Sequence, residues 1–216
     1  QRQKRLDSFA SAPYIHPFNQ PKYHALICHA VKYARATSQQ VFWCVAQDWP
    51  LTAEDEQLTE DELQRCRQGW LGSHDQRTGG VMGLLPFVLD MPLRFTDNVD
   101  REKRIFKNTG GTLKKIVLPD EEATRVRDCQ DAEIVLQRLP VCLIIEVTEG
   151  QEEPLLFELK SEYVVWSRDA GGYAKVKRRG FRVVPDFANT AHGYCAKLPD
   201  GPFFTWTLCS RNPTQS

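Results

Sequence analysis

The sequence predicts an α/β fold that is interrupted by a β-rich insertion. Residues 1–80 carry helical and strand patterns in the order helix, strand, helix. Between residues 81 and 184 the pattern changes to six short strand-like segments separated by turn residues, which is typical of a small barrel or a curled sheet. Residues 185–197 then become helical again, so we expect the chain to return to the α/β part near residue 184.

The first helix is expected to begin at Asn19, which can cap it, and Pro21 is tolerated in the first turn. Apolar residues then recur at helical spacing, namely Tyr23, Leu26, Ile27, Ala30, Val31 and Ala34. Residues 39–48 form a run of β-branched and aromatic residues that ends in Asp48-Trp49-Pro50. This run predicts a buried strand.

A second helix is predicted by two capping-box patterns that precede an apolar series. The first pattern pairs Thr52 with Asp55, and the second pairs Thr59 with Glu62. The apolar series that follows is Leu63, Cys66, Trp70 and Leu71. The order helix, strand, helix is therefore an α/β beginning.

The strand-like segments of the insertion are rich in β-branched and aromatic residues. They read VMGLLPFVLDMPLRF, GTLKKIVL, PVCLIIEV, PLLFELK, YVVWS and YAKVKRRGFRVV. Only residues 128–139, DCQDAEIVLQRL, predict a helix between these strands. The insertion is therefore expected to be almost entirely β-structure.

Composition places the chain among ordinary globular proteins, with 41% hydrophobic and 26% charged residues. The 28 basic and 28 acidic residues cancel, which excludes a histone-like polycation. Seven cysteines without CxxC spacing indicate reduced thiols in an intracellular protein, and no run approaches the roughly 18 apolar residues of a membrane span. Because the sequence begins at Gln1 instead of Met, we expect it to be part of a longer protein.

The charges are unevenly distributed, because residues 173–182 hold five bases and no acid whereas residues 52–62 hold six acids and no base. Side chains alternate along a strand, so Lys175, Lys177 and Arg179 should share one face with Tyr173. Such a face can bind phosphates while the aromatic ring stacks on a base, and we include Arg178 among the candidate DNA-binding residues. The alternative is a solvated sheet face without a ligand.

Other candidate sites have weaker support. His24 and Cys28 lie four residues apart on the first helix, with His29 next to them and His16 upstream, but the neighbouring apolar residues define a buried face. No second Cys or His pair has zinc-finger spacing, so we expect no metal site.

We also expect no catalytic residue in this chain. Cys195 and His192 could form a thiol–imidazole pair, but no oxyanion turn or cysteine-protease signature surrounds them. The acidic pair Asp61 and Glu62 lies in a solvated helix and not at the end of an apolar strand. The sequence contains no G-x-x-x-x-G-K-[ST] loop, so this chain alone should neither cradle the phosphates of ATP nor hydrolyse it.

Several segments occur together in a recognisable order between residues 8 and 198. They are APYIHPFNQPKYHA with WCVAQDWP, GWLGSHDQRTGGVMGLLPFVLDMPLRFTDNVD, IFKNTGGTLKKIVL and RRGFRVVPDFANTAHGYCAK. In this order they resemble the C-terminal part of the superfamily 1B DNA helicases of the petite-integration-frequency and Helitron transposase group, which is related to RecD.

The resemblance implies a second RecA-like helicase domain, of the P-loop NTPase type, that is interrupted by a small β-rich SH3-like insertion. It assigns residues 1–80 to the first part of the RecA-like domain and residues 81–183 to the insertion, which helps to hold single-stranded DNA in that family. Residues 184–200 would return to the RecA-like domain, and residues 201–216 match nothing in the family.

The returning segment resembles the family motif T-x-H-K-S-Q-G-x-T, which touches DNA and couples it to the nucleotide site. Thr190 and His192 match the motif and are the expected DNA-binding residues, whereas Cys195 is expected to pack against the sheet. The remaining motif positions depart from the family, since they hold Gly193, Cys195, Ala196 and Leu198. The arginine-bearing motif that should follow is also missing.

The resemblance therefore implies a fragment of a transposon-type or repair-type DNA helicase. The complete enzyme would bind ATP and Mg²⁺ between two RecA-like domains, whereas this chain holds no cofactor and lacks the N-terminal motor domain. Its expected partner is single-stranded DNA, and its expected location is intracellular, in the nucleus if the host is eukaryotic. Two alternatives stay open, namely a stand-alone nucleic-acid-binding β module and an inactive transposon remnant.

Overall fold

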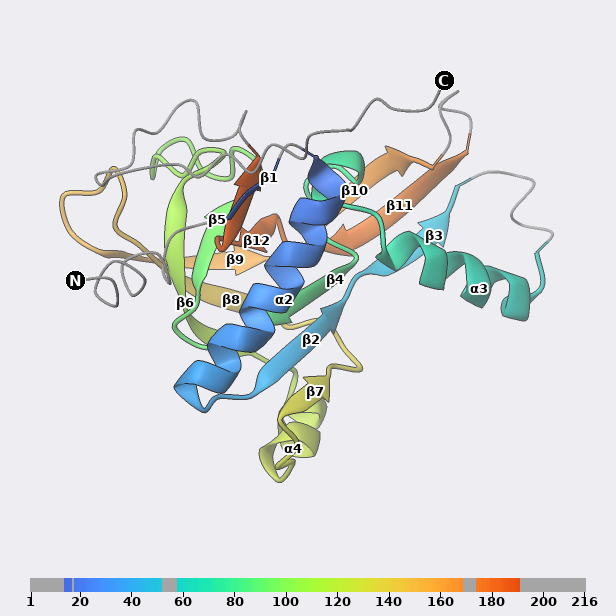
Figure 1. Ribbon diagram of the computed structural model, residues 1–216, viewed down its shortest axis with the longest axis horizontal. Coiled ribbons are helices and arrows are strands. Elements are labelled where there is room, and N and C mark those ends of the chain that lie inside the picture. Colours follow the sequence, from blue (N-terminus) through green and yellow to red (C-terminus); the bar gives the residue numbers. More distant parts are fainter. Residues whose placement is uncertain (1–13, 17, 52–57, 169–173, 191–216) are drawn as a thin grey trace, which may run out of the picture.

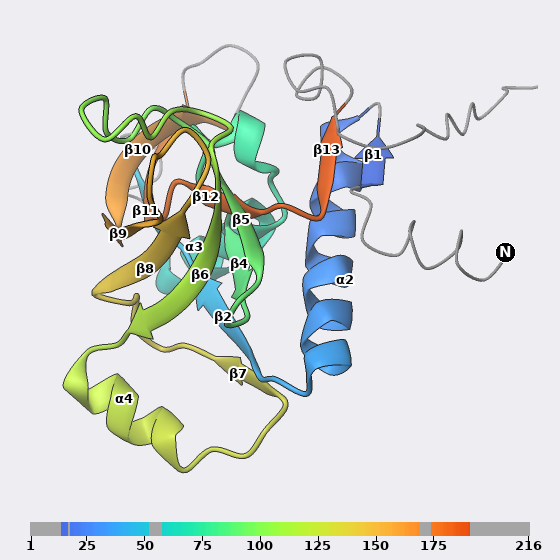
Figure 2. The same ribbon diagram turned by 90° about the vertical axis from the view of Figure 1, so that its left-hand side faces the viewer.

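The computed structural model describes residues 14–16, 18–51, 58–168 and 174–190. A long helix, α2 (Asn19–Thr37), lies along one side of several small β-sheets, as Figures 1 and 2 show. The chain is mixed α/β, as the sequence predicts. No helix among the described residues combines the length and the apolar character needed to cross a membrane.

Helix α2 has the predicted position and the predicted buried face. Tyr23, Leu26, Ala30 and Ala34 are buried and recur every three or four residues. The helix is preceded by Phe18 in extended conformation without a side-chain cap, so the expected cap at Asn19 is wrong. The helix ends at Thr37, and the left-handed backbone of Ser38 turns the Ser38 N–H back toward the carbonyls of Ala34 and Arg35.

The predicted strand at residues 39–48 is divided between two sheets. β2 (Val41–Val45) ends before Ala46, and β3 (Gln47–Pro50) continues in a different sheet. The Asp48-Trp49-Pro50 segment therefore belongs to β3 and forms the end of that strand. Pro50 is tolerated because β3 lies at a sheet edge, where its missing N–H interrupts no ladder.

Helix α3 (Glu60–Leu71) begins with the predicted capping box. The Glu62 N–H donates to Thr59 Oγ1 over 3.4 Å, and the Thr59 N–H donates to Glu62 Oε2 over 2.9 Å. The Thr59 hydroxyl also donates to Glu62 Oε2 over 2.7 Å, and this bond, followed by the one from the Thr59 N–H, holds the pKa of the Glu62 carboxyl below its ordinary value. The other predicted box, Thr52 with Asp55, lies outside the described residues.

The β-rich part of the chain forms one five-stranded antiparallel sheet with the order β12-β5-β6-β8-β9. Its strands are β5 (Pro92–Phe95), β6 (Gly110–Val117), β8 (Cys142–Val147), β9 (Leu155–Lys160) and β12 (Val183–Pro185). All five come from the strand-like segments of the predicted insertion. Their pairing is antiparallel throughout, as expected of short strands joined by turns.

Two three-stranded sheets connect the first fifty residues to this β-rich part. One has the order β4-β2-β7, with β4 at Leu84–Phe87 and β7 at Glu133–Val135. The other has the order β10-β11-β3, with β10 at Glu162–Ser167 and β11 at Lys175–Gly180. Strands from both sides of the predicted boundary at residues 80 and 81 therefore share sheets.

The helix predicted at residues 128–139 is wrong. Helix α4 lies earlier, at Asp120–Arg127, where Pro119 precedes three acidic residues in the first turn. Residues 133–135 instead form β7, which pairs in parallel with β2 and buries Ile134. These residues are a strand because they pair with β2, which lies about ninety residues earlier in the sequence. The sequence of the segment itself gives no sign of this pairing.

The helix predicted at residues 185–197 is also wrong where the structure describes it. Ala188–Thr190 forms β13, which pairs in parallel with β1 (Tyr14–His16), and Figure 2 shows this pair beside α2. The remainder of that predicted helix, residues 191–197, lies outside the described residues.

One hydrophobic core joins α2 to the five-stranded sheet and to the β4-β2-β7 sheet. Edge-to-face ring pairs reinforce it, with Phe87 against Phe181 and Phe95 against Phe157. Lys22 and Asp75 form a buried ion pair at 3.0 Å that ties α2 to the short 3₁₀ helix η2 (Asp75–Arg77). The helix and the sheets consequently form one packed unit.

A second buried ion pair lies beneath the β10-β11-β3 sheet. Arg178 Nε and Nη2 donate to the two carboxylate oxygens of Asp48, each over 2.7 Å. The same guanidinium donates to the carbonyls of Val81 (3.2 Å) and Trp70 (2.9 Å). One side chain therefore joins β11, β3, the end of α3 and the segment before β4.

Replacing Arg178 by Met should destabilise the protein by about 3–5 kcal/mol, because it leaves the Asp48 carboxylate buried without its partner. Urea unfolding measures this change. Lys115→Met is the control, since the Lys115 side chain is exposed on β6, and it should change stability by less than about 0.5 kcal/mol. The double variant Asp48→Leu with Arg178→Met should recover most of the loss; a double variant no more stable than Arg178→Met would contradict this account.

Replacing Thr59 by Ala should destabilise the protein by about 0.5–2 kcal/mol at neutral pH, because it removes the cap of α3. The pKa of Glu62 is lower in the folded protein than in the unfolded chain, because Thr59 binds the ionised carboxylate. This bond therefore stabilises the fold at pH values above the unfolded-state pKa of Glu62, and the stabilisation is lost as the pH falls through its folded-state pKa. The difference between variant and wild type in urea unfolding should therefore shrink at acid pH. Thr148→Ala, on an exposed loop, is the control.

Candidate nucleic-acid interface

The β10-β11-β3 sheet has one face against the protein and one face toward solvent. On the central strand, β11, the side chains of Val176 and Arg178 point inward and are buried, and Gly180 is buried as well. Lys175 is exposed and Lys177 and Arg179 are half-buried, which confirms the predicted alternation. We call Lys175, Lys177 and Arg179 the basic stripe.

Arg178 does not belong to this interface. Its side chain is 0% exposed, and its guanidinium is bonded to Asp48 and to two backbone carbonyls. No phosphate can reach it without unfolding the sheet. The inclusion of Arg178 among DNA-binding residues is therefore wrong, because the same alternation that exposes its neighbours turns it inward.

The register of the sheet places aromatic and apolar residues beside the basic stripe. Arg179 pairs with Tyr163 on β10, and Lys177 pairs with Val165 on β10 and with Trp49 on β3. These outer strands lie on either side of β11, as Figure 1 shows. Residues that are more than a hundred positions apart in the sequence thus share one face.

Trp49 and Tyr163 reach toward each other from the two outer strands. Their ring centroids are 5.9 Å apart at an angle of 48°. Lys177 Nζ lies 4.3 Å from the centre of the Tyr163 ring, and Arg179 Cζ lies 5.6 Å from it. Since both cations are within cation–π distance, they help to hold the ring in place. We call Trp49 and Tyr163 the aromatic pair.

The electrostatic character of this face is positive. Among its described positions, which are Gln47, Trp49, Tyr163, Val165, Ser167 and the basic stripe, none is acidic. Arg179 Nε donates to Ser161 Oγ over 3.0 Å, so its guanidinium retains further donors. Glu162 at the start of β10 is bound by Arg182 Nε at 2.8 Å, which neutralises it.

The aromatic pair was missed by the sequence analysis, which assigned stacking to Tyr173. Tyr173 lies outside the described residues. Period-two alternation in β10 does place Tyr163 and Val165 on one face, so a partial signal existed. Trp49 had none, because its position opposite Lys177 depends on a strand pairing across most of the chain.

The two motif residues predicted from the returning segment are only partly described. Thr190 is the last residue of β13, and its backbone pairs with His16 of β1. His192 lies outside the described residues, as do Cys195 and the rest of the motif. The DNA-binding role of Thr190 and His192 stays a prediction.

The histidine and cysteine of α2 are not gathered into a cluster. The His24 ring lies 3.4 Å from the side-chain nitrogen of Gln20, and Cys28 is exposed. His29 stacks on Phe187, and partial burial together with Lys32 lowers its pKa. Throughout the described ranges, no group of three potential metal ligands occurs.

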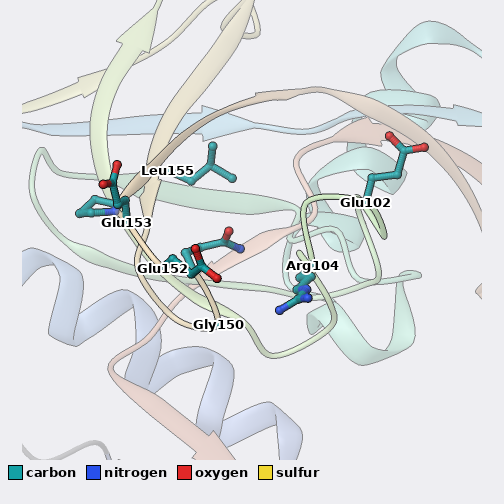
Figure 3. Close-up of a pocket in the computed structure, with 8 residues that line it drawn as sticks. Glu102, Arg104, Gly150, Glu152, Glu153 and Leu155 are labelled. Atoms are coloured by element: carbon teal, nitrogen blue, oxygen red, sulfur yellow. The ribbon is translucent and has the colours of Figure 1, made fainter.

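A pocket of about 480 Å³ lies between the loop that holds Glu102 and Arg104 and the loop that precedes β9, as Figure 3 shows. Its charged lining side chains are the acids Glu102, Glu152 and Glu153 and the base Arg104. None of its lining residues is buried. Mixed charges on exposed loops give it no preorganised set of donors for a ligand, unlike the face of the β10-β11-β3 sheet.

Comparison with known proteins yields no family model and no curated relative that matches the sequence. Among solved structures, the chain is similar to the Pif1 helicase from Candida albicans, with 14% identity and a TM-score of 0.46 over 78% of this chain and 34% of that one. It is also similar to a Bacteroides Pif1 helicase bound to single-stranded DNA, with 12% identity and a TM-score of 0.37 over 77% of this chain and 30% of that one. The chain thus spans about a third of the length of the helicases it matches.

Proposed function

We propose that this chain is a DNA-binding part of a superfamily 1B helicase of the Helitron type. In this proposal it contributes part of the second RecA-like motor domain and an SH3-like β-rich grip on single-stranded DNA. The observation that carries the proposal is the basic stripe on the solvent face of the β10-β11-β3 sheet. The ordered sequence segments that resemble this helicase group support the choice of a helicase.

The basic stripe suits a polyanionic strand for a simple physical reason. Alternate residues of a strand lie about 6.7 Å apart, so the three cations form a row along β11. Each phosphate that a Lys or Arg neutralises releases condensed counterions, which favours binding at low salt. With no acidic side chain among the described positions of the face, little opposes this attraction.

In this proposal ATP and Mg²⁺ bind to an N-terminal motor domain and not to this chain. Gly79 and Gly80 both have positive φ and form a glycine turn, but the Gly80 N–H already donates to the Asp75 carbonyl over 2.9 Å. The Gly80 carbonyl accepts from Thr96 Oγ1 over 2.6 Å. This turn therefore offers no free cradle for a phosphate, and we assign nucleotide binding to an N-terminal motor domain that the proposal requires as partner.

A second candidate is a stand-alone nucleic-acid-binding β module without motor activity. One observation favours it. This chain alone supplies the basic stripe, the two strands beside it and the ion pair beneath them, so the face needs no second chain to form. The two candidates differ in whether an upstream coding segment supplies a phosphate-binding loop. Sequencing that adjoining segment separates them.

The combined replacement of Lys175, Lys177 and Arg179 by Ala should weaken the binding of oligothymidylate and flatten its salt dependence. Each lost phosphate contact should reduce the slope of log K against log salt by roughly 0.7, hence by about 2 for three contacts. Fluorescence anisotropy of a labelled strand at several salt concentrations measures this slope. Replacing Lys32, Lys107 and Lys115, which are exposed elsewhere, removes the same charge and should leave the slope unchanged; equal effects of both triple variants would refute a specific stripe.

The purified chain should release no phosphate from ATP, with or without single-stranded DNA, because the phosphate-cradling loop is absent from its sequence. A phosphate-release assay on the chain measures this. The triple Ala variant serves as a control for contaminating ATPases, which would be unaffected by it. DNA-stimulated turnover by the wild type that the triple variant lacks would contradict the prediction.

A further inference from the structure

We infer that the aromatic pair, Trp49 and Tyr163, is a stacking site for unpaired bases, which makes this surface select single strands over duplexes. The inference rests on the proposed function, since it assigns a second kind of contact to the same face. It concerns residues that neither the charge pattern nor the family motif identifies.

The rings are available to a ligand. Trp49 is 37% exposed and Tyr163 is 52% exposed, and they lie together over the central strand of the sheet. Val165, next to them on β10, is 55% exposed. A contiguous group of large exposed apolar side chains on a face that also carries cations is unusual for a merely solvated surface, and it indicates a binding site.

The rings are also held in position before any ligand binds. Asp48 precedes Trp49 on β3, and Arg178 lies between Lys177 and Arg179 on β11. The buried ion pair between Asp48 and Arg178 therefore fixes the backbone that carries Trp49, Lys177 and Arg179. Lys177 and Arg179 in turn lie over the Tyr163 ring, so little conformational entropy is lost when a base stacks on the pair.

The charge of the site identifies the ligand. A base offers its flat face only when it is unpaired and unstacked, and its backbone brings one phosphate for each nucleotide. The aromatic pair can take the base while Lys177 and Arg179, on the strand between the rings, lie close enough to bind the flanking phosphates. A proline-rich peptide would also suit exposed Trp and Tyr rings, but it brings no phosphates to Lys177 and Arg179.

The test compares two strands of equal length and equal charge, oligothymidylate and the corresponding abasic strand. Wild-type protein should bind oligothymidylate more tightly by about 5- to 150-fold for each stacked base. Tyr163→Ala and Trp49→Ala should each reduce this preference and leave the salt slope unchanged, whereas Tyr163→Phe keeps the ring and should retain it. Leu156→Ala, an exposed apolar residue on β9 outside the face, should have no effect.

A second measurement does not depend on alanine variants. Oligothymidylate should quench the indole fluorescence of the wild-type protein, and the fluorescence of Trp49→Phe should respond much less. Near-ultraviolet circular dichroism confirms that each variant is folded.

The outcomes separate the inference from the proposed function. No salt-dependent binding of either strand would overturn the proposed function and the inference together. Two results would overturn stacking alone. One is that wild-type protein binds oligothymidylate and the abasic strand equally tightly, with the same salt slope for both. The other is that the preference for oligothymidylate survives both Tyr163→Ala and Trp49→Ala. Tight binding of a polyproline peptide in place of oligothymidylate would overturn the assignment to nucleic acid.

Discussion

The Arg178–Asp48 ion pair is the interaction on which the arrangement of the β10-β11-β3 sheet depends. Removing two charges from water costs several kcal/mol for each ion, so the pair is tolerated only because the guanidinium is bonded on several sides. Both carboxylate oxygens and the carbonyls of Val81 and Trp70 accept from it. These requirements leave one register for β3 against β11 and one position for the end of α3.

A consequence of this pair is that β11 serves two purposes with alternate residues. Its inward residues hold the sheet together, and its outward residues form the basic stripe. A shift of one residue would expose Arg178 and bury Lys177 without a partner, which the sheet would not tolerate. The buried charge therefore specifies which charges remain available to a ligand.

The β10-β11-β3 sheet is built from strands that lie far apart in the sequence, and β3 joins it to the remainder of the described residues. β3 follows β2 directly, and β2 lies in a sheet with β4 and β7 that shares its core with the five-stranded sheet. The solvent face of the β10-β11-β3 sheet is therefore attached to the rest of the packed unit and does not belong to a separate lobe. The predicted boundaries at residues 80 and 183 divide the sequence but do not divide the sheets.

The sequence by itself determined the features that depend on neighbouring residues: the positions of α2 and α3, the capping box at Thr59 and Glu62, and the alternation along β11. Only the tertiary structure decided which face of β11 is buried, because Arg178 finds its partner 130 residues away. The tertiary structure also decided that Trp49 lies against Tyr163. It decided as well that residues 133–135 form a strand, because β2 lies beside them. Periodicity within a segment is a local property, whereas register and partner choice follow from burying distant segments against one another.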